Sequence, residues 1–342
     1  MFFFDVGQRV YNEGRIGIVI DTFVGEDGNT RYVVEFKSNN PKVVEVVENF
    51  LAKDLELVEG VLMYAKPYVD SKLIELKERV EKLNKRPKLV IIRANNDEPS
   101  ERYIRNKIKK CEEVGVLSEI IRYDENVTQE EIKNKIEELN SDDEVCGILL
   151  QLPIYEHLDS DYLIDQICPY KEIDGFCTYN MGRLALGKPL NVACTSLGIV
   201  RFLEFNNIDL KGKTVTIVNA SNVIGKPLAH LVLQRGGTPI VCHIHTKDLK
   251  HKMKIADIVV LGTGNADFVG AEDFVKGQIV IDVSINVGKN GKLCGDIKKE
   301  DYNKLLRKGV SFTPVPRGCG ELTVLTLVEQ TVNVAERREK IE

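Results

Sequence analysis

The sequence predicts an α/β protein in which two α/β domains follow a small N-terminal β module. Three observations support this prediction. The 342 residues exceed the usual size of a single domain. From residue 61 onward, buried-strand patterns alternate with helical patterns, as is typical of parallel sheets covered by helices. Before that point, short β-prone segments and turn residues prevail. The predicted units are residues 1–60, 61–185, 186–320 and 321–342.

The N-terminal module (1–60) contains three β-prone segments, at residues 8–11, 14–20 and 31–36. Turn residues such as those at 26–29 separate them. Short strands joined by such turns predict an antiparallel, SH3-like unit. A spacer or oligomerisation element is the simpler interpretation of its role, and a binding module is the alternative.

The first α/β domain (61–185) is predicted from apolar residues at helical spacing that alternate with short apolar runs. Such alternation favours a parallel sheet with helices packed on it. The predicted helices cover residues 69–83, 100–114 and 128–139, and the predicted strands cover 88–92, 119–123 and 147–150.

The second α/β domain (186–320) begins with a buried strand that is followed by a turn and a helix over 221–236. This order is typical of a doubly wound, Rossmann-type nucleotide-binding domain. Its predicted strands cover 214–218, 238–242, 256–261 and 278–283. A final helix over 323–340 is expected to pack back on the first α/β domain.

Composition excludes several classes of protein. A net charge of −5 disfavours nucleic acid as a partner, because phosphate binding needs a clustered positive field. The eight cysteines are scattered without a C-x-x-C pair, which predicts reduced thiols and no metal site. The N-terminal apolar run ends at Asp5 and is too short to span a membrane. We therefore expect a cytoplasmic protein.

The first candidate site lies in the predicted helix over 100–114. Ser100, Tyr103 and Lys107 are spaced i, i+3 and i+7, so they share one helix face. A desolvated lysine has a lowered pKa and can relay protons near neutral pH. Taken alone, a helix cap at Ser100 and a solvated lysine are the simpler interpretations.

Two further motifs follow buried segments. Gln151 lies just past the predicted strand over 147–150, at the carboxyl edge where sites in open α/β sheets form. Asp174 lies in Ile173-Asp174-Gly175-Phe176, and a carboxylate can orient a flat heterocycle through two parallel hydrogen bonds. A polar strand end and an ordinary turn are the alternatives.

In this order, the motifs resemble the bifunctional methylenetetrahydrofolate dehydrogenase/methenyltetrahydrofolate cyclohydrolase (FolD) family, from about Val61 to Ala335. The resemblance implies oxidation of 5,10-methylenetetrahydrofolate with NADP, hydrolysis to 10-formyltetrahydrofolate, and a homodimer. NAD is the alternative cofactor. The resemblance also implies that Lys107 is the acid/base, that Tyr103 packs on the folate, and that Gln151 hydrogen-bonds the lysine. Substrate binding is expected from Ser100, Asp174, Gly318 and Gly320.

The nucleotide side departs from the family pattern. Asn219 and Ala220 stand where the family has glycine and arginine, and we expect Asn219 to adopt the left-handed conformation. The turn is expected to hold phosphate through its backbone N–H groups. Ile244 and His245 also depart from the family, and Lys247 can substitute for the basic residue near the 2′-phosphate. The expected cofactor contacts are Asn219, Ser221, Gly225, His245, Lys247 and Gly264.

Arg317 stands where the family has a glycine that lines the shared folate and nicotinamide pocket. We expect it to add bulk and charge there, and Ser284 continues the same trend. These departures predict a dehydrogenase weaker than the cyclohydrolase, with Arg317→Gly restoring some cofactor binding. A catalytically weak folate or nucleotide sensor is one alternative, and a dehydrogenase of another small substrate is a second.

Overall fold

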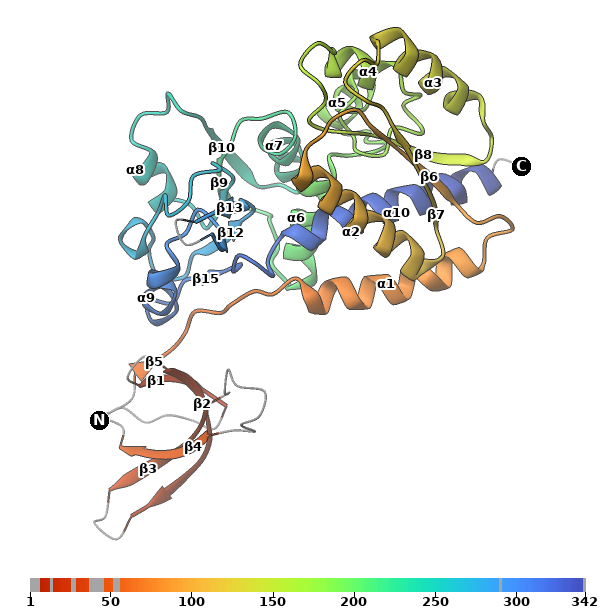
Figure 1. Cartoon of the computed structure of the whole chain (residues 1–342). Helices are drawn as coiled ribbons and strands as arrows, with labels where there is room; N and C mark the ends of the chain where they lie inside the picture. The colour runs from red at the N-terminus through yellow and green to blue at the C-terminus, as the bar shows by residue number, and fades with distance from the viewer. Residues whose placement is uncertain are drawn as a thin grey trace.

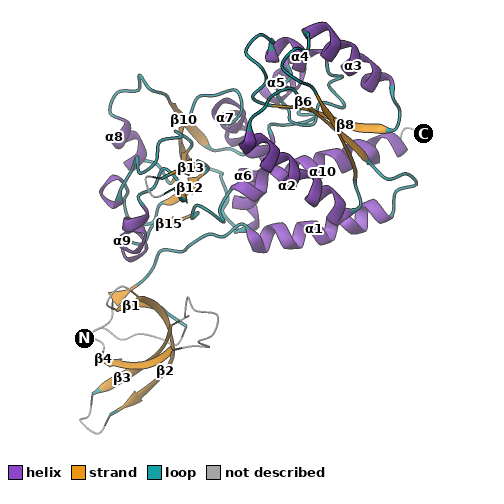
Figure 2. Cartoon of the chain, viewed as in Figure 1, coloured by secondary structure: helices purple, strands orange, loops and turns teal. Residues whose placement is uncertain are grey.

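The computed structural model describes residues 7–12, 15–25, 29–36, 46–51, 56–288 and 291–340. It contains an N-terminal β sheet and two α/β units that lie side by side (Figures 1 and 2). The predicted α/β class is therefore confirmed. The predicted turn at 26–29 lies mostly outside the described residues. Among the described helices, none combines the length and the apolar character that a membrane span requires.

The N-terminal sheet is antiparallel, with strand order β4-β3-β2-β1-β5. Successive side chains of a strand point to opposite faces of the sheet. On one face, Val10, Val19, Tyr32 and Val34 form a small buried core. The three β-prone segments form strands, and two further strands follow that were not predicted. The bounds are β1 (Arg9–Asn12), β2 (Arg15–Val24), β3 (Thr30–Phe36), β4 (Val46–Leu51) and β5 (Glu56–Leu57).

The first α/β unit has a parallel sheet of order β7-β6-β8, in which every residue of β8 is buried. Two short helices in its second half, α4 and α5, were not predicted. The bounds are α1 (Lys66–Glu81), β6 (Lys88–Arg93), α2 (Glu98–Val114), β7 (Leu117–Arg122), α3 (Gln129–Ser141), β8 (Val145–Gln151), α4 (Ser160–Gln166) and α5 (Thr178–Ala185).

Helix α2, which carries the first motif, has well-defined ends. Asp97 is its N-cap, and its carboxylate accepts from the Ser100 N–H at 2.7 Å. Pro99 lies in the first turn, where no intrahelical N–H is lost. Gly115 ends the helix in the left-handed conformation, at φ +88°. The alternative in which Ser100 caps the helix is therefore wrong, because Asp97 does so.

The second α/β unit is a parallel sheet of order β10-β9-β11-β12-β15. Its carboxyl strand ends lie at one edge, as the Rossmann-type prediction requires. The strands are β9 (Thr214–Val218), β10 (Thr238–Cys242), β11 (Ile258–Leu261), β12 (Ile279–Asp282) and β15 (Ser311–Phe312), with the hairpin β13 (Asn286–Val287) and β14 (Leu293–Cys294). The helices are α6 (Cys194–Phe205), α7 (Gly225–Gln234), α8 (Leu249–Lys254), α9 (Tyr302–Arg307), η2 (Ala271–Asp273) and η3 (Lys299–Asp301).

Helix α10 (Gly320–Glu339) begins between the two α/β units and runs across the first (Figure 1). It packs against α6, α1, α2 and β8. One hydrophobic core includes Leu76 of α1, Phe202 of α6, Ile217 of β9 and Val328 of α10. The two α/β units therefore share this core, and each also has a hydrophobic cluster of its own.

The N-terminal sheet attaches to the second α/β unit through the segment that follows β5. Leu62 pairs in parallel with Phe312, and the Met63 N–H donates to the Phe312 carbonyl at 2.8 Å. A Cβ on Gly60 would lie 2.3 Å from the Val310 carbonyl oxygen, so only glycine allows this close approach. Residues 61–63, assigned from sequence to the first α/β domain, thus extend the sheet of the second beside β15.

Candidate functional site

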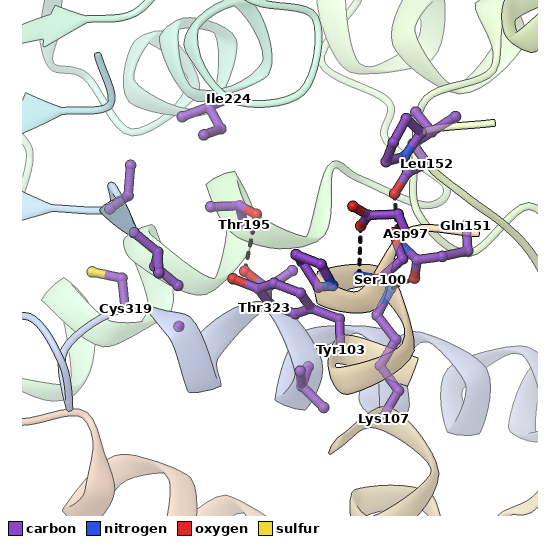
Figure 3. A pocket seen from close by; sticks show the side chains of 16 residues that line it. Asp97, Ser100, Tyr103, Lys107, Gln151, Leu152, Thr195, Ile224, Cys319 and Thr323 are labelled. Carbon is purple, nitrogen blue, oxygen red and sulfur yellow. Dashed lines mark hydrogen bonds between the residues drawn. The ribbon is translucent and has the colours of Figure 1, made fainter. Parts of the chain in front are cut away.

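A cavity of about 450 Å³ lies between the two α/β units. Figure 3 shows Ser100, Tyr103 and Lys107 on one side, with Cys319 across the cavity and Thr195 and Thr323 between them. Eight of the lining residues come from the second unit and α10, and four of these carry aliphatic side chains, namely Ile224, Val283, Ile285 and Val324. The lining residues are Asp97, Pro99, Ser100, Tyr103, Lys107, Gln151, Leu152, Pro153, Thr195, Ile224, Val283, Ile285, Cys319, Gly320, Thr323 and Val324.

Lys107 is the buried amine of this cavity, with 7% of its surface exposed. Its Nζ donates to Gln151 Oε1 at 2.9 Å, which confirms the predicted contact between the two side chains. Gln151 Nε2 in turn donates to the Leu152 carbonyl at 2.7 Å, which fixes the orientation of the amide. Burial lowers the pKa of Lys107, and nearby Asp174 opposes that change. An amide therefore holds the amine without adding charge.

Tyr103 and Ser100 occupy the same face of α2 as Lys107 (Figure 3). Tyr103 is 39% exposed, so its ring presents a flat surface to the cavity and to solvent. Burial raises the pKa of its phenol above the ordinary value. Ser100 is buried and also lines the cavity. The predicted face of hydroxyl, phenol and amine is therefore present.

Asp174 lies in a tight turn that a buried carboxylate organises. Glu172 accepts from the N–H groups of Asp174 and Gly175 at 3.0 and 2.9 Å. Gly175 has φ +78°, and a Cβ there would lie 2.2 Å from the Val192 carbonyl carbon. Burial raises the pKa of Asp174, while the neighbouring Lys107 lowers it. Asp174 does not line the cavity itself but lies beside the lysine that does.

The turn between β9 and α7 is organised by Asn219. Its Oδ1 accepts from the N–H groups of Ser221 and Gly225 at 2.9 and 3.0 Å, and its Nδ2 donates to the Gly262 carbonyl at 2.7 Å. Asn219 does not have positive φ, so the expected left-handed conformation is wrong. The hydrogen bonds of its side chain hold the turn without a left-handed backbone conformation at this position.

Several of the backbone N–H groups that were expected to hold phosphate have partners within the turn. The N–H groups of Ser221 and Gly225 already donate to Asn219, and that of Ile224 donates to Ser221 Oγ at 3.1 Å. These three donors are therefore engaged within the turn. Gly225 is required for another reason, because a Cβ there would lie 2.0 Å from the Asn219 carbonyl oxygen.

The other expected cofactor residues lie at exposed strand ends and do not line the cavity. His245 and Lys247 are exposed after β10, and the His245 N–H donates to His243 Nδ1 at 3.1 Å. Gly264 follows β11 with φ +72° and donates its N–H to Ser284 Oγ at 3.1 Å. Residues 242–247 contain one lysine, two imidazoles and a threonine hydroxyl but no carboxylate. That donor set fits a phosphorylated ribose, so the residues present suit NADP.

The expectation for Arg317 is wrong. Its side chain is exposed and does not line the cavity, and its guanidinium lies 5.7 Å from the centre of the Tyr64 ring. Its backbone has φ +81°, a conformation that glycine adopts without strain. Of the two neighbouring glycines named from sequence, Gly320 lines the cavity, and Gly318 is buried beside the Pro314 carbonyl.

Arg317→Gly is therefore expected to leave the NADP dissociation constant within about twofold, because no cavity atom is removed. Relief of the positive φ is worth about 1 kcal/mol and is partly offset by the lost contact with Tyr64 and by the greater freedom of glycine in the unfolded chain. Calorimetric titration with NADP and a urea melt measure the two effects. A tenfold gain in NADP affinity would show instead that the Arg317 side chain hinders cofactor binding, as the sequence predicted.

Several cavity residues were not identified from sequence. Thr195 and Thr323 contact each other in the cavity lining, with their Oγ1 atoms 2.9 Å apart (Figure 3). They are 128 residues apart, at the first turns of α6 and α10, and no local pattern links such positions. Asp97 carried a detectable signal, because an aspartate before Pro99 is typical of a helix N-terminus.

The comparisons with known proteins agree with this geometry. Residues 63–174 match the tetrahydrofolate dehydrogenase/cyclohydrolase catalytic domain, and residues 193–339 match the NAD(P)-binding domain of the same family. The bifunctional protein FolD of Agathobacter rectalis is 41% identical over 278 residues, which cover 79% of this chain and 99% of that protein.

Two solved structures show the same arrangement. The bifunctional FolD enzyme of Campylobacter jejuni is 37% identical with a TM-score of 0.78, over 81% of this chain and 99% of that one. The Trypanosoma brucei FolD enzyme, solved with NADP and an inhibitor, is 28% identical with a TM-score of 0.76, over 82% and 99%. Nothing in these comparisons supports a weakened dehydrogenase or a sensor. The chain belongs to the tetrahydrofolate dehydrogenase/cyclohydrolase family.

Proposed function

We propose that this protein oxidises 5,10-methylenetetrahydrofolate with NADP and hydrolyses the resulting methenyl compound to 10-formyltetrahydrofolate. The observation that carries the proposal is a buried Lys107, held by Gln151, in a cavity that the nucleotide-binding unit also lines. One cavity thus brings together an acid/base and the carboxyl edge of a Rossmann-type sheet. NAD is the alternative cofactor.

Lys107 supplies the proton transfers of the hydrolysis. A cationic methenyl group beside the amine disfavours the ammonium form and adds to the effect of burial on the lysine pKa. The neutral amine accepts a proton as the water oxygen bonds to the methenyl carbon. The same proton then passes to a ring nitrogen as the bond between that nitrogen and the former methenyl carbon breaks. The proton of the new hydroxyl group leaves to solvent as the formyl C=O bond forms. Gln151 keeps Nζ in place throughout, since its Oε1 accepts only one of the amine protons.

The remaining cavity residues orient the two reactants. NADP, when bound, accepts the hydride. Ile224, Val283 and Ile285 form an apolar wall at the carboxyl edge of the second unit and exclude water from the transfer. Tyr103 offers its ring face to the aromatic part of the folate. His245 and Lys247, which are exposed after β10, would hold the phosphorylated ribose beyond the strand ends.

A paired assay on the purified protein tests this function. Hydrolysis of methenyltetrahydrofolate and NADP-dependent oxidation of methylenetetrahydrofolate are followed separately in the same preparation. Turnover in both assays supports the proposal. Binding of folate without turnover in either assay would favour the sensor alternative, and hydrolysis alone would favour a protein specialised as a cyclohydrolase.

Asp174→Asn tests the folate contact. We propose that Asp174 accepts from the amino and ring N–H groups of the pterin, next to Lys107. The amide keeps the shape but replaces one acceptor with a donor, which should weaken folate binding by about 1.5 to 3 kcal/mol. Titration calorimetry measures the change. An unchanged affinity would remove Asp174 from the folate site.

We also propose that the protein is a cytoplasmic homodimer. The eight cysteines are free thiols, as a reducing compartment maintains. Strand β10 ends the Rossmann-type sheet, and among the described residues no strand pairs with its outer edge. Exposed apolar side chains lie on and beside it, including Leu233, Val241 and Ile244. Sedimentation equilibrium should give twice the 38.5 kDa mass of one chain, and a single-chain mass would contradict the dimer.

A further inference from the structure

Gln330 of α10 is a buried amide outside the cavity that contacts two separate loops of the folate side. It is 3% exposed, and it is not among the cavity residues. Its Nε2 donates to the Ile173 carbonyl at 2.5 Å and to the Val192 carbonyl at 3.0 Å. Its Oε1 accepts from the Val192 N–H at 2.8 Å, and its Nε2 lies 3.3 Å from Cys194 Sγ. One side chain therefore binds both loops.

Each of these loops leads directly to the site. Ile173 precedes Asp174, the proposed pterin carboxylate. Cys194 begins α6, and the next residue, Thr195, lines the cavity and contacts Thr323. The loops touch one another as well, because Cys194 Sγ donates to the Ile173 carbonyl at 3.4 Å and a Cβ on Gly175 would clash with Val192. Small displacements of one loop are therefore transmitted to the other.

An amide is suited to this position because it donates and accepts. The carbonyls of Ile173 and Val192 need donors, and the Val192 N–H needs an acceptor. Buried backbone groups left without partners are costly, so removal of the amide would favour a shift of both loops. A methionine has similar length and bulk but offers none of these hydrogen bonds.

We propose that Gln330 is a positioning residue of the folate site. It holds the Asp174 turn and the start of α6 in place relative to Lys107. The proposal rests on the proposed role of Asp174 in folate binding. Because Gln330 reaches the substrate only through these loops, its loss should raise the folate KM more than it lowers kcat. A merely structural residue would instead lower stability without changing either constant in the protein that remains folded.

The test compares variants of the full chain in the methenyltetrahydrofolate hydrolysis assay, at a temperature where circular dichroism shows each to be folded. Gln330→Met is expected to raise KM about tenfold while kcat stays within about threefold, since a displacement of less than 1 Å at the carboxylate suffices. Gln330→Asn keeps a shorter amide and should give a smaller rise. It also preserves the test if the methionine variant does not fold. An unchanged KM in a folded Gln330 variant would overturn the proposal.

Glu329→Gln is the matched control on the neighbouring residue of α10. Glu329 is also buried, but it pairs with Arg201 and with Lys72, 3.4 Å away on α1. Its variant should lower the melting temperature and leave KM unchanged. If Glu329→Gln raises KM as much as Gln330→Met, the effect belongs to the packing of α10 and the proposal fails.

The double variant of Gln330→Met with Asp174→Asn separates this proposal from the proposed function. Once the Asp174 carboxylate is lost, Gln330 no longer positions a group that binds folate. The double variant should therefore raise KM by clearly less than the product of the two single effects. If Asp174→Asn alone has no effect on KM, the folate role of Asp174 is wrong. If Asp174→Asn raises KM and the two effects simply multiply, Gln330 does not act through Asp174.

Discussion

Lys107→Met is expected to reduce methenyltetrahydrofolate hydrolysis by about 10²-fold or more, the contribution typical of a positioned acid/base. Methionine fills the same buried space, so folding and folate binding should largely persist. Gln151 Oε1 loses the donor it now accepts from at 2.9 Å, which costs some stability. Steady-state kinetics and calorimetric titration with folate separate the loss of turnover from a loss of binding.

Lys109→Met is the control for this experiment, because it removes an exposed lysine from the same helix. Its activity should match that of the unmodified protein. Near-normal turnover in Lys107→Met would show that the proton passes through another group, and equal losses in both variants would point to helix stability instead.

The pH profile of hydrolysis gives a second view of the same residue. Burial lowers the pKa of Lys107, and only the neutral amine can take a proton from water. The rate should therefore rise as pH increases through this lowered pKa and then level off. The rise should be absent from the residual activity of Lys107→Met. A rate that falls over the same range would contradict the role of the neutral amine.

Gly225→Ala is expected to lower NADP-dependent oxidation on the order of 10²-fold, while hydrolysis is largely retained. A Cβ would lie 2.0 Å from the Asn219 carbonyl oxygen, so the turn between β9 and α7 must move by about 1 Å or more. That movement also disturbs Ile224 in the cavity wall. The dissociation constant for NADP and the ratio of the two activities measure the effect.

Gly182→Ala is the matched glycine control. It lies on α5, where an added Cβ meets nothing within 4 Å, and alanine should slightly stabilise the helix. Both activities should be unchanged in this variant. If Gly225→Ala impairs hydrolysis as strongly as oxidation, the turn supports the whole cavity and not the nucleotide side in particular.

Sequence reasoning was most successful where a pattern is local. Helical spacing placed Ser100, Tyr103 and Lys107 on one face, and the cavity contains all three. The end of a buried strand placed Gln151 at the carboxyl edge, within 2.9 Å of Lys107 Nζ. In each case, regular secondary structure determines the direction of the side chain from its position in the sequence.

The failures have a common physical cause, since they concern groups whose partners lie far away in the chain. The Asn219 side chain donates to the Gly262 carbonyl, 43 residues away, and its backbone does not have positive φ. Arg317 turns toward Tyr64, which no local pattern brings near it. The pairing of Thr195 with Thr323 depends on how α6 and α10 cross. Tertiary packing decided each of these positions.

The strand-like segment at residues 60–63 has a practical consequence for anyone who trims the chain to match its relatives. A truncation that begins at α1 would uncover the edge of β15, whose Phe312 N–H and carbonyl now bond to Val61 and Met63. Uncovered strand edges recruit other chains, so such a protein should aggregate. A truncation that begins at Val58 keeps the edge covered, and light scattering would distinguish the two preparations.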